Sequence, residues 1–277
     1  MKNRGPTLTR SQARRLELAW QAFDGEDWEK AELYARELLA ETKNHPDVQV
    51  LTAALHLEKG DPLTALLTLK RCRGKVRDEV NWQYFFGTAL TDALRFQEAE
   101  IELQQVVAAD PEWPAAVFAL AEALDLLERY EEAEEWYRRA ANLDPENYPA
   151  PARMPRSAFD RVVDEAVAEM PADLQRALRR VAVVVADLPS REVLTAPAGE
   201  PPFNPRILGL FVGPRLPDMS PATAIAFPPT IFIYQRNLER VCRTRSQLLL
   251  EIGATLRHEL GHFLGLSEAD LHERGLQ

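Results

Sequence analysis

Small apolar residues recur at a fixed spacing along the first half of the chain. Alanine fills four positions that are each 34 residues apart, and another small residue lies twelve positions before each of them. The first set is Ala31, Ala65, Ala99 and Ala133, and the second is Ala19, Ala53, Gly87 and Ala121. Small side chains at both places let two antiparallel helices approach closely. The pattern therefore predicts one helix pair in every 34 residues.

Residues that begin and end helices repeat with the same period. Three positions before each alanine of the first set, where the second helix of a pair should start, stand Trp28, Pro62, Phe96 and Tyr130. Asp-Pro pairs close two of the units. A single pair cannot bury its apolar face, so we expect four pairs to stack over residues 12–147. The second pair is the least regular, since Gly74 falls where its second helix should be ending.

The apolar pattern changes after Pro149. Residues 148–156 are rich in proline, which denies helix hydrogen bonds, and they predict a stiff linker. An apolar stripe that starts near Ser157 predicts an amphipathic helix, and residues 172–180 predict a shorter one. We therefore expect a second domain over residues 157–277.

Three short apolar runs in this second domain predict strands. Val181–Val185 is a β-branched run, typical of a strand buried on both faces. The other two are Ile207–Val212 and Thr230–Tyr234, and a pair of prolines before the last one places it at a sheet edge. A helix over residues 245–263 follows Thr244 with the spacing of a capping box. The predicted fold class is an all-α array followed by an α+β domain with a small mixed sheet.

Composition and charge narrow the classes of partner and compartment. The chain has 33 Lys and Arg against 43 Asp and Glu, and the acidic excess lies entirely before residue 148. Such a balance argues against nucleic acid as a partner. Two distant cysteines exclude a disulfide framework or a cysteine-based zinc site and fit a reducing compartment. Because neither a signal peptide nor a membrane span is recognised, we expect a cytoplasmic protein with no membrane partner.

The predicted helix over residues 245–263 contains the H-E-x-x-H pattern. His258 and His262 lie four positions apart, so on a helix both can present an imidazole nitrogen to one metal ion. Glu259 lies about 100° round the helix from His258, where it can reach a metal-bound water rather than the metal. Zinc suits these ligands, and Glu259 is then the candidate general base.

A third ligand is expected just beyond this helix. Gly265 ends the helix and lets the chain turn back, and Glu268 falls ten residues after His258. Asp270 and His272 are the alternatives for this position. The competing interpretation is structural: two surface histidines, with Glu268 in the first turn of another helix, where acidic residues are favoured.

The array resembles the tetratricopeptide repeat family. The likeness is strongest over residues 114–147, where the family's pattern is met by Leu120, Ala121, Tyr130, Ala133, Tyr137, Ala140 and Pro145. The resemblance implies a peptide or protein partner on a concave face, with a scaffold or dimer contact as the alternative. Helical spacing favours the core for most of the candidate aromatic anchors, which are Trp20, Trp82, Tyr84, Phe85 and Trp113.

Residues 157–277 resemble the small bacterial zincin-like metallopeptidases, a minimal zincin fold. The likeness rests on the opening helix, Leu208–Gly213, Ile231–Tyr234 and the ending H-E-L-G-H-F-L-G-L-S-E. It implies a general base at Glu259 and zinc held by His258, His262 and Glu268. The chain departs from the larger metzincins, because no methionine follows Met219.

Together these patterns predict a zinc metallopeptidase whose repeats recruit a protein substrate or a regulatory partner. The alternative is an adaptor with a catalytically silent or latent zincin fold, against which the intact Glu259 counts. Zincins bind an extended peptide along a sheet edge, for which Thr230–Tyr234 is the candidate. Tyr234 and Arg257 could stabilise an oxyanion, but we leave both outside the predicted site.

Overall fold

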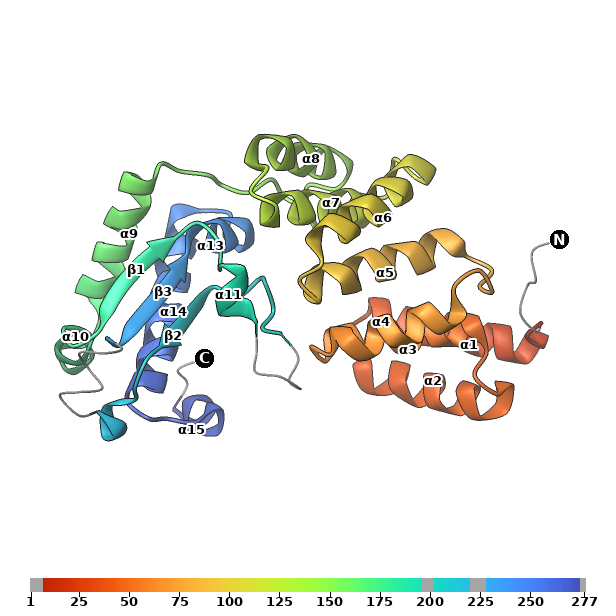
Figure 1. The fold of residues 1–277 in the computed structure, drawn as a ribbon, viewed down its shortest axis with the longest axis horizontal. Coiled ribbons are helices and arrows are strands. Elements are labelled where there is room, and N and C mark those ends of the chain that lie inside the picture. The colour runs from red at the N-terminus through yellow and green to blue at the C-terminus, as the bar shows by residue number, and fades with distance from the viewer. Residues whose placement is uncertain (1–6, 196–201, 220–227, 275–277) are drawn as a thin grey trace. The chain divides into compact units, whose positions relative to one another are not determined.

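The computed structural model describes residues 7–195, 202–219 and 228–274 (Figure 1). The chain divides into two compact units. The repeat unit comprises residues 1–149 and 191–205, and the sheet unit comprises residues 150–190 and 206–277. The first is helical and the second is α+β, which confirms the predicted fold class. Among the described residues no helix is long and apolar enough to cross a membrane.

Residues 7–149 form four consecutive helix pairs. Within each pair the two helices pack against one another, and each pair packs on the next. The helices are α1 (Arg10–Asp24), α2 (Trp28–Thr42), α3 (Pro46–Glu58), α4 (Pro62–Cys72), α5 (Glu79–Asp92), α6 (Phe96–Ala109), α7 (Pro114–Leu126) and α8 (Tyr130–Leu143). The short α4 ends at Cys72, just before Gly74, where the sequence pattern is least regular. A further short helix, α11 (Arg191–Leu194), is grouped with this unit.

The residues that repeat every 34 positions lie where helices touch. All seven alanines of the two sets are fully buried, and Gly87 is buried as well. A Cβ atom on Gly87 would lie only 2.7 Å from Cγ of Leu103, so α5 and α6 approach more closely than alanine allows. The predicted packing role of the small residues is therefore confirmed.

A second feature with the same period was not predicted from the sequence. The turn inside each helix pair contains one residue with a left-handed backbone: Glu26 (φ 58°), Gly60 (φ 71°), Leu94 (φ 59°) and Glu128 (φ 59°). This conformation costs an ordinary residue about 1–2 kcal/mol, and only one of the four is glycine. The other three turns therefore retain a strained residue.

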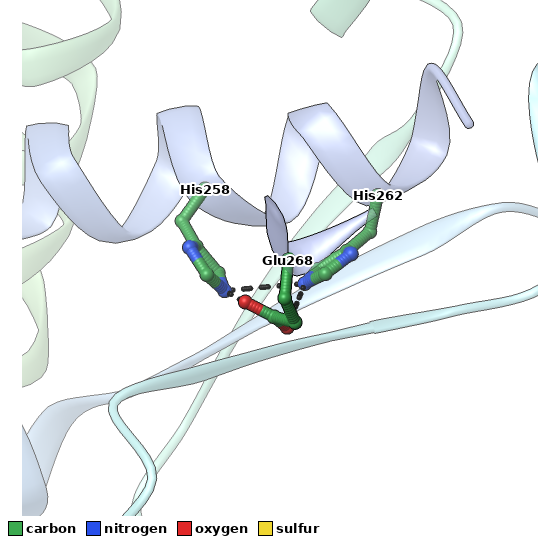
Figure 2. Close-up of side chains that lie close together, drawn as sticks. All are labelled: His258, His262 and Glu268. Carbon is green, nitrogen blue, oxygen red and sulfur yellow. Dashed lines mark hydrogen bonds and ion pairs between the residues drawn. The ribbon is translucent and has the colours of Figure 1, made fainter. Parts of the chain in front are cut away.

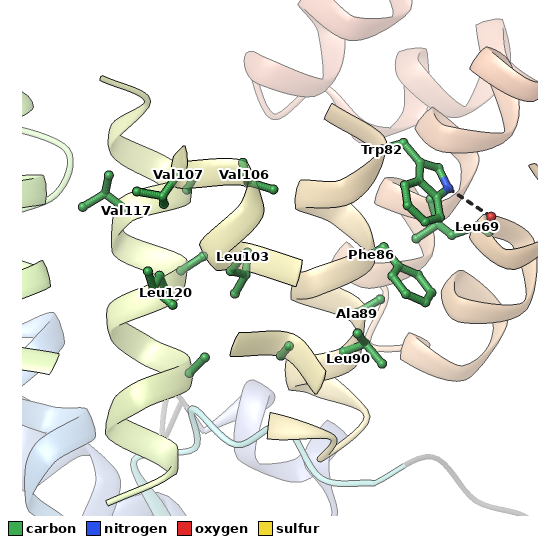
Figure 3. Close-up of a cluster of buried hydrophobic side chains, with 14 of the residues drawn as sticks. Leu69, Trp82, Phe86, Ala89, Leu90, Leu103, Val106, Val107, Val117 and Leu120 are labelled. Carbon is green, nitrogen blue, oxygen red and sulfur yellow. Dashed lines mark hydrogen bonds between the residues drawn. The ribbon is translucent and has the colours of Figure 1, made fainter. Parts of the chain in front are cut away.

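The core of the array runs through successive pairs (Figure 3). Trp82 on α5 is buried and donates its indole N–H to the Leu69 carbonyl at 3.0 Å. The other four candidate anchors are half-buried: Trp20, Tyr84, Phe85 and Trp113. Their rings form one continuous series, with centroids 5.4 Å apart for Trp20 and Phe85 and 4.6 Å apart for Tyr84 and Trp113. They are thus partly core and partly surface.

The sheet unit places two long helices against a small sheet. Its elements are α9 (Arg156–Glu169), α10 (Ala172–Leu178), β1 (Ala182–Ala186), β2 (Gly209–Val212), a 3₁₀ turn η1 (Leu216–Asp218), β3 (Thr230–Tyr234), α13 (Gln235–Val241), α14 (Arg245–Phe263) and α15 (Glu268–Glu273). Fully buried side chains of β3, α9 and α14 form its core: Ile231, Ile233, Phe159, Ile252, Leu256 and Leu260. This packing holds α14 firmly beside the sheet.

The strand order is β1-β3-β2, with β3 parallel to β1 and antiparallel to β2. The expectation that Thr230–Tyr234 lies at a sheet edge is therefore wrong. The prolines do not prevent central pairing, because they precede the strand and the Pro229 carbonyl accepts a hydrogen bond from the Ala182 amide. The expectation that the first strand is buried on both faces is also wrong, since β1 is an edge strand and Val184 is 40% exposed.

Two segment ends in this unit are fixed by side chains. The Thr244 hydroxyl caps α14 by accepting a hydrogen bond from the Gln247 amide at 3.1 Å. In a capping box the Gln247 side chain would accept in return from the Thr244 amide. Here it accepts from the Arg243 amide instead, one residue earlier. The proline-rich segment before α9 is tied to α13. There the Met154 amide donates to the buried Glu239 carboxylate at 3.0 Å.

Candidate metal centre

Two histidines project side by side from the C-terminal half of α14. His258 and His262 lie one helical turn apart, and their Nε2 atoms are 3.1 Å from each other (Figure 2). Their side chains are 27% and 22% exposed, so both imidazoles reach solvent while their helix is held by the core. This is the geometry that the four-residue spacing predicts.

Glu268 joins the histidines because the chain reverses directly after α14. Gly265, with φ 89°, supplies a left-handed residue at the turn, and α15 then begins at Glu268. The Glu268 Oε1 atom lies 3.2 Å from Nε2 of His262 and 3.9 Å from Nε2 of His258 (Figure 2). Within the described part of the chain, these are the three residues whose ligand atoms converge.

The two alternative third ligands do not join this cluster. Asp270 is occupied at the start of α15, where its carboxylate accepts from the amide and the hydroxyl of Ser267 at 2.8 Å and 2.5 Å. His272 is exposed on α15 and lies outside the convergent group.

Leu271 of α15 packs closely against Gly261 of α14. Leu271 is fully buried, and its Cδ2 atom occupies the space that a Cβ atom on Gly261 would need. Gly261 stands between the two histidines in the sequence. Its lack of a side chain therefore lets α15, and with it Glu268, approach the imidazoles.

The converging atoms fit a zinc ion. In a tetrahedral site with bonds of about 2.0–2.1 Å, two ligand atoms lie roughly 3.3 Å apart. Two of the three observed separations, 3.1 Å and 3.2 Å, are close to this value. The third is longer, but Glu268 is 70% exposed and has room to adjust. Two imidazole nitrogens and a carboxylate oxygen are also a donor set that zinc accepts.

Glu259 faces β2 instead of this cluster. Its carboxylate is buried, and Oε2 accepts a hydrogen bond from the Phe211 amide at 2.7 Å. Burial raises the pKa of Glu259, and the Phe211 amide opposes this by stabilising the charged form. Gly209 permits the approach of β2 to α14, because a Cβ there would lie 2.5 Å from Cγ2 of Thr255 and 3.3 Å from Cγ of Glu259.

Sequence reasoning missed both Phe211 and Gly209. Phe211 and Glu259 are 48 residues apart, and no local pattern says which strand amide a helix carboxylate will meet. Knowledge of the strand order would have been needed, since it decides that β2 is the edge next to α14.

Tyr234 and Arg257 lie in different surroundings. Tyr234 is 1% exposed, and its hydroxyl has no hydrogen-bond partner among the described residues. Burial, aided by the negative charge of Glu259, raises the pKa of Tyr234 to about 12, so this hydroxyl stays protonated. The guanidinium of Arg257 lies back along α14, near Gly253.

Comparison with known families matches the two units separately. A model described as a zincin-like metallopeptidase matches residues 178–276, and one described as a tetratricopeptide repeat matches residues 86–149. The chain joins a tetratricopeptide repeat region to a zincin-like metallopeptidase domain. The zincin-like domain contains all the residues of the convergent cluster and Glu259.

Among solved structures, similarity is found to repeat proteins. MamA (41-end) from Desulfovibrio magneticus RS-1 is 23% identical with a TM-score of 0.41, and the match covers 50% of this chain and 79% of that one. YrrB, described as a TPR protein with an unusual peptide-binding site, is 19% identical with a TM-score of 0.40, over 51% of this chain and 74% of that one. No curated protein matches the chain.

Proposed function

We propose that the protein is a zinc-dependent peptidase whose repeats recruit a protein substrate or a regulatory partner. One observation carries the proposal: His258, His262 and Glu268 converge on one point, one helical position away from a buried carboxylate. Bound zinc would lower the pKa of a coordinated water to about 7 and polarise the scissile carbonyl. The zincin-like family match supports the same reaction class.

Glu259 is the proposed general base. Its carboxylate takes a proton from the attacking water and later returns it to the leaving amine. The bond from the Phe211 amide fixes one carboxylate oxygen at 2.7 Å and leaves the other available for this transfer. Burial keeps its pKa above that of an exposed glutamate, which makes the carboxylate a stronger base toward the attacking water.

The outer edge of β2 is the proposed track for the substrate backbone. Leu208 directs its carbonyl toward β3, where it accepts from the Tyr234 amide. Backbone groups alternate in direction along a strand, so those of Gly209 and Phe211 point away from β3. The Phe211 amide is bonded to Glu259, so the carbonyls of both residues and the Gly209 amide are the groups proposed to pair with the substrate. This edge runs past Glu259, and β2 therefore takes the role that the sequence suggested for Thr230–Tyr234.

The repeat unit is the proposed recruiting surface. Its half-buried aromatic series, from Trp20 to Trp113, offers apolar area that a bound segment could cover.

We propose that the protein is located in the cytoplasm, because the two cysteines are buried and unpaired with one another.

Metal content and cleavage together test the peptidase proposal. We expect zinc in the purified wild-type protein and in Glu259→Gln, with cleavage of a peptide library by the wild type only. Loss of the proton acceptor should lower turnover at least a hundredfold while the ligands stay in place.

Other outcomes assign other functions. Absence of zinc from the wild-type protein would overturn the proposal. Zinc without turnover in either form would favour the adaptor or a latent enzyme. A partner captured by residues 12–147 then distinguishes these two. Adding it restores cleavage by a latent enzyme but not by an adaptor.

A further inference from the structure

A pocket opens beside the proposed catalytic residues, on the side of α14 that precedes them in the chain. Its volume is about 240 Å³, below the roughly 300–1,000 Å³ of pockets that hold drug-sized ligands. A space of this size suits one amino-acid side chain. Its lining comes from Ile207, Leu208, Gly209, Glu251, Ala254, Thr255, His258 and Glu259.

The pocket leads from the reacting groups to a single carboxylate. Glu251 lies seven residues before His258, so both project from the same face of α14. At 1.5 Å per residue they are about 10 Å apart along the helix axis. Between them the walls are small or apolar, with Ala254 on the helix and Leu208 on the strand side.

Among the described residues, the Glu251 carboxylate has no cation paired with it. Within residues 7–195, 202–219 and 228–274, the hydrogen bond of Glu251 is made by its backbone carbonyl, which accepts from the Thr255 hydroxyl at 2.8 Å. The other acidic side chain of the pocket lining, Glu259, accepts a hydrogen bond from the Phe211 amide. Glu251 is therefore available to a positively charged group that enters the pocket.

We propose that Glu251 selects substrates with a lysine or arginine next to the scissile bond. This inference rests on the proposed peptidase function and adds the substrate class. The aliphatic stem of a basic side chain packs along the apolar walls, and its cation reaches the Glu251 carboxylate. An acidic side chain meets repulsion at the same place, and a long apolar one fills the pocket but forms no ion pair.

Cleavage of matched peptides tests this selectivity. The peptides differ at one position next to the cleaved bond, which carries lysine, norleucine or glutamate. For the wild type we expect kcat/KM to be about tenfold or more higher with lysine than with norleucine. Glu251→Gln should bring this ratio near one, and Glu251→Lys should favour the glutamate peptide.

Glu169→Gln is the matched control. It makes the same change of charge at an exposed position of α9, away from the pocket, and should keep the wild-type ratio. A wild type that cleaves peptides without preferring a basic residue would overturn the inference and leave the peptidase proposal standing. The same conclusion would follow if Glu251→Gln retained the full preference.

Binding separates failure of the inference from failure of the peptidase proposal. Fluorescent lysine and norleucine peptides are titrated onto zinc-loaded Glu259→Gln and onto Glu259→Gln/Glu251→Gln. We expect tighter binding of the lysine peptide by the first protein and equal binding of both peptides by the second. Equal affinities for the first protein would overturn the inference, even if no variant cleaved any peptide.

Discussion

Gly261 stands between the two histidines of α14, and its missing side chain controls how close α15 can come. Leu271 fills the space above Gly261 and is fully buried, although the helix that carries it has only six residues. Such a short helix has little stability of its own. The position of Glu268 therefore depends on the packing of Leu271 against Gly261 and on the Ser267 cap.

We predict that Gly261→Ala weakens zinc binding at least tenfold. Adding a methyl group to a packed contact costs about 1–3 kcal/mol. Here the added methyl group should push α15 away from α14 and carry Glu268 away from the histidines. Competition with a chromophoric chelator measures the affinity, and circular dichroism reports whether the fold survives. Gly253→Ala is the control on the same helix, because its Cβ would meet only the flexible end of Arg257.

A double-mutant cycle distinguishes this contact from a general loss of stability. Leu271→Ala alone should also weaken zinc binding, since α15 loses its anchor. The Gly261→Ala/Leu271→Ala protein should lose less than the sum of the two single losses, because the smaller side chain removes the clash. Additive losses would contradict the proposed contact.

At the scale of elements, the turn inside each helix pair has the same backbone but different residues. Glu26 and Gly60 occupy equivalent left-handed positions, and no atom of the described residues lies within 4 Å of a Cβ atom placed on Gly60. Substitution at these two turns therefore measures the free-energy cost of the left-handed backbone without a change in side-chain packing. Leu94, at the third turn, is buried and does not offer this separation.

We predict that Glu26→Gly stabilises the repeat unit by about 0.5–1 kcal/mol and that Gly60→Ala destabilises it by a similar amount. Urea unfolding followed by circular dichroism measures both changes. Leu94→Gly is the contrasting variant: it also relieves the backbone but removes a buried side chain, so it should not stabilise. Equal stabilisation by all glycine variants would show that burial at this turn is unimportant.

Local patterns predicted elements better than they predicted how elements meet. The helix over residues 245–263 was predicted with the bounds that the structure has, because its cap and its glycine lie within the sequence segment itself. The order of the strands could not be derived, since Ala182 pairs with the distant Thr230. The histidine pair depends on helix geometry alone, whereas the Phe211 contact and the pocket beside Glu251 depend on that strand order.

For the whole molecule, the reactivity of the two cysteines can be used to follow the folding of each unit separately. Cys72 lies in the repeat unit and Cys242 in the sheet unit, and both are buried. Burial raises the pKa of each thiol from 9.0 to about 11. The thiolate that reacts with disulfide reagents is therefore scarce at pH 8 in the folded protein.

We predict that removing the metal exposes one cysteine and not the other. The proposed zinc site lies in the sheet unit and needs that unit to be folded, so a chelator should speed the reaction of Cys242 with Ellman's reagent and leave Cys72 unchanged. Cys72→Ala and Cys242→Ala identify which thiol reacts. Equal acceleration at both cysteines would mean that the units unfold together.

The same thiols give an expected dependence on pH. Because each pKa is raised in the folded state, the protonated thiol favours folding. This contribution is fully present below about pH 9 and is lost as the pH rises toward about 11. Alkaline unfolding should therefore begin at a higher pH in the alanine variants, as measured by fluorescence.

The central position of β3 also bears on how the protein is made. β1 and β2 precede β3 in the chain but do not pair with one another, so both lack their neighbour until Tyr234 has been synthesised. The helix pairs form through contacts between neighbouring segments and can fold as they leave the ribosome. The proposed recruiting surface would then be complete before the proposed catalytic site exists, so an active peptidase would appear only after its repeats have folded.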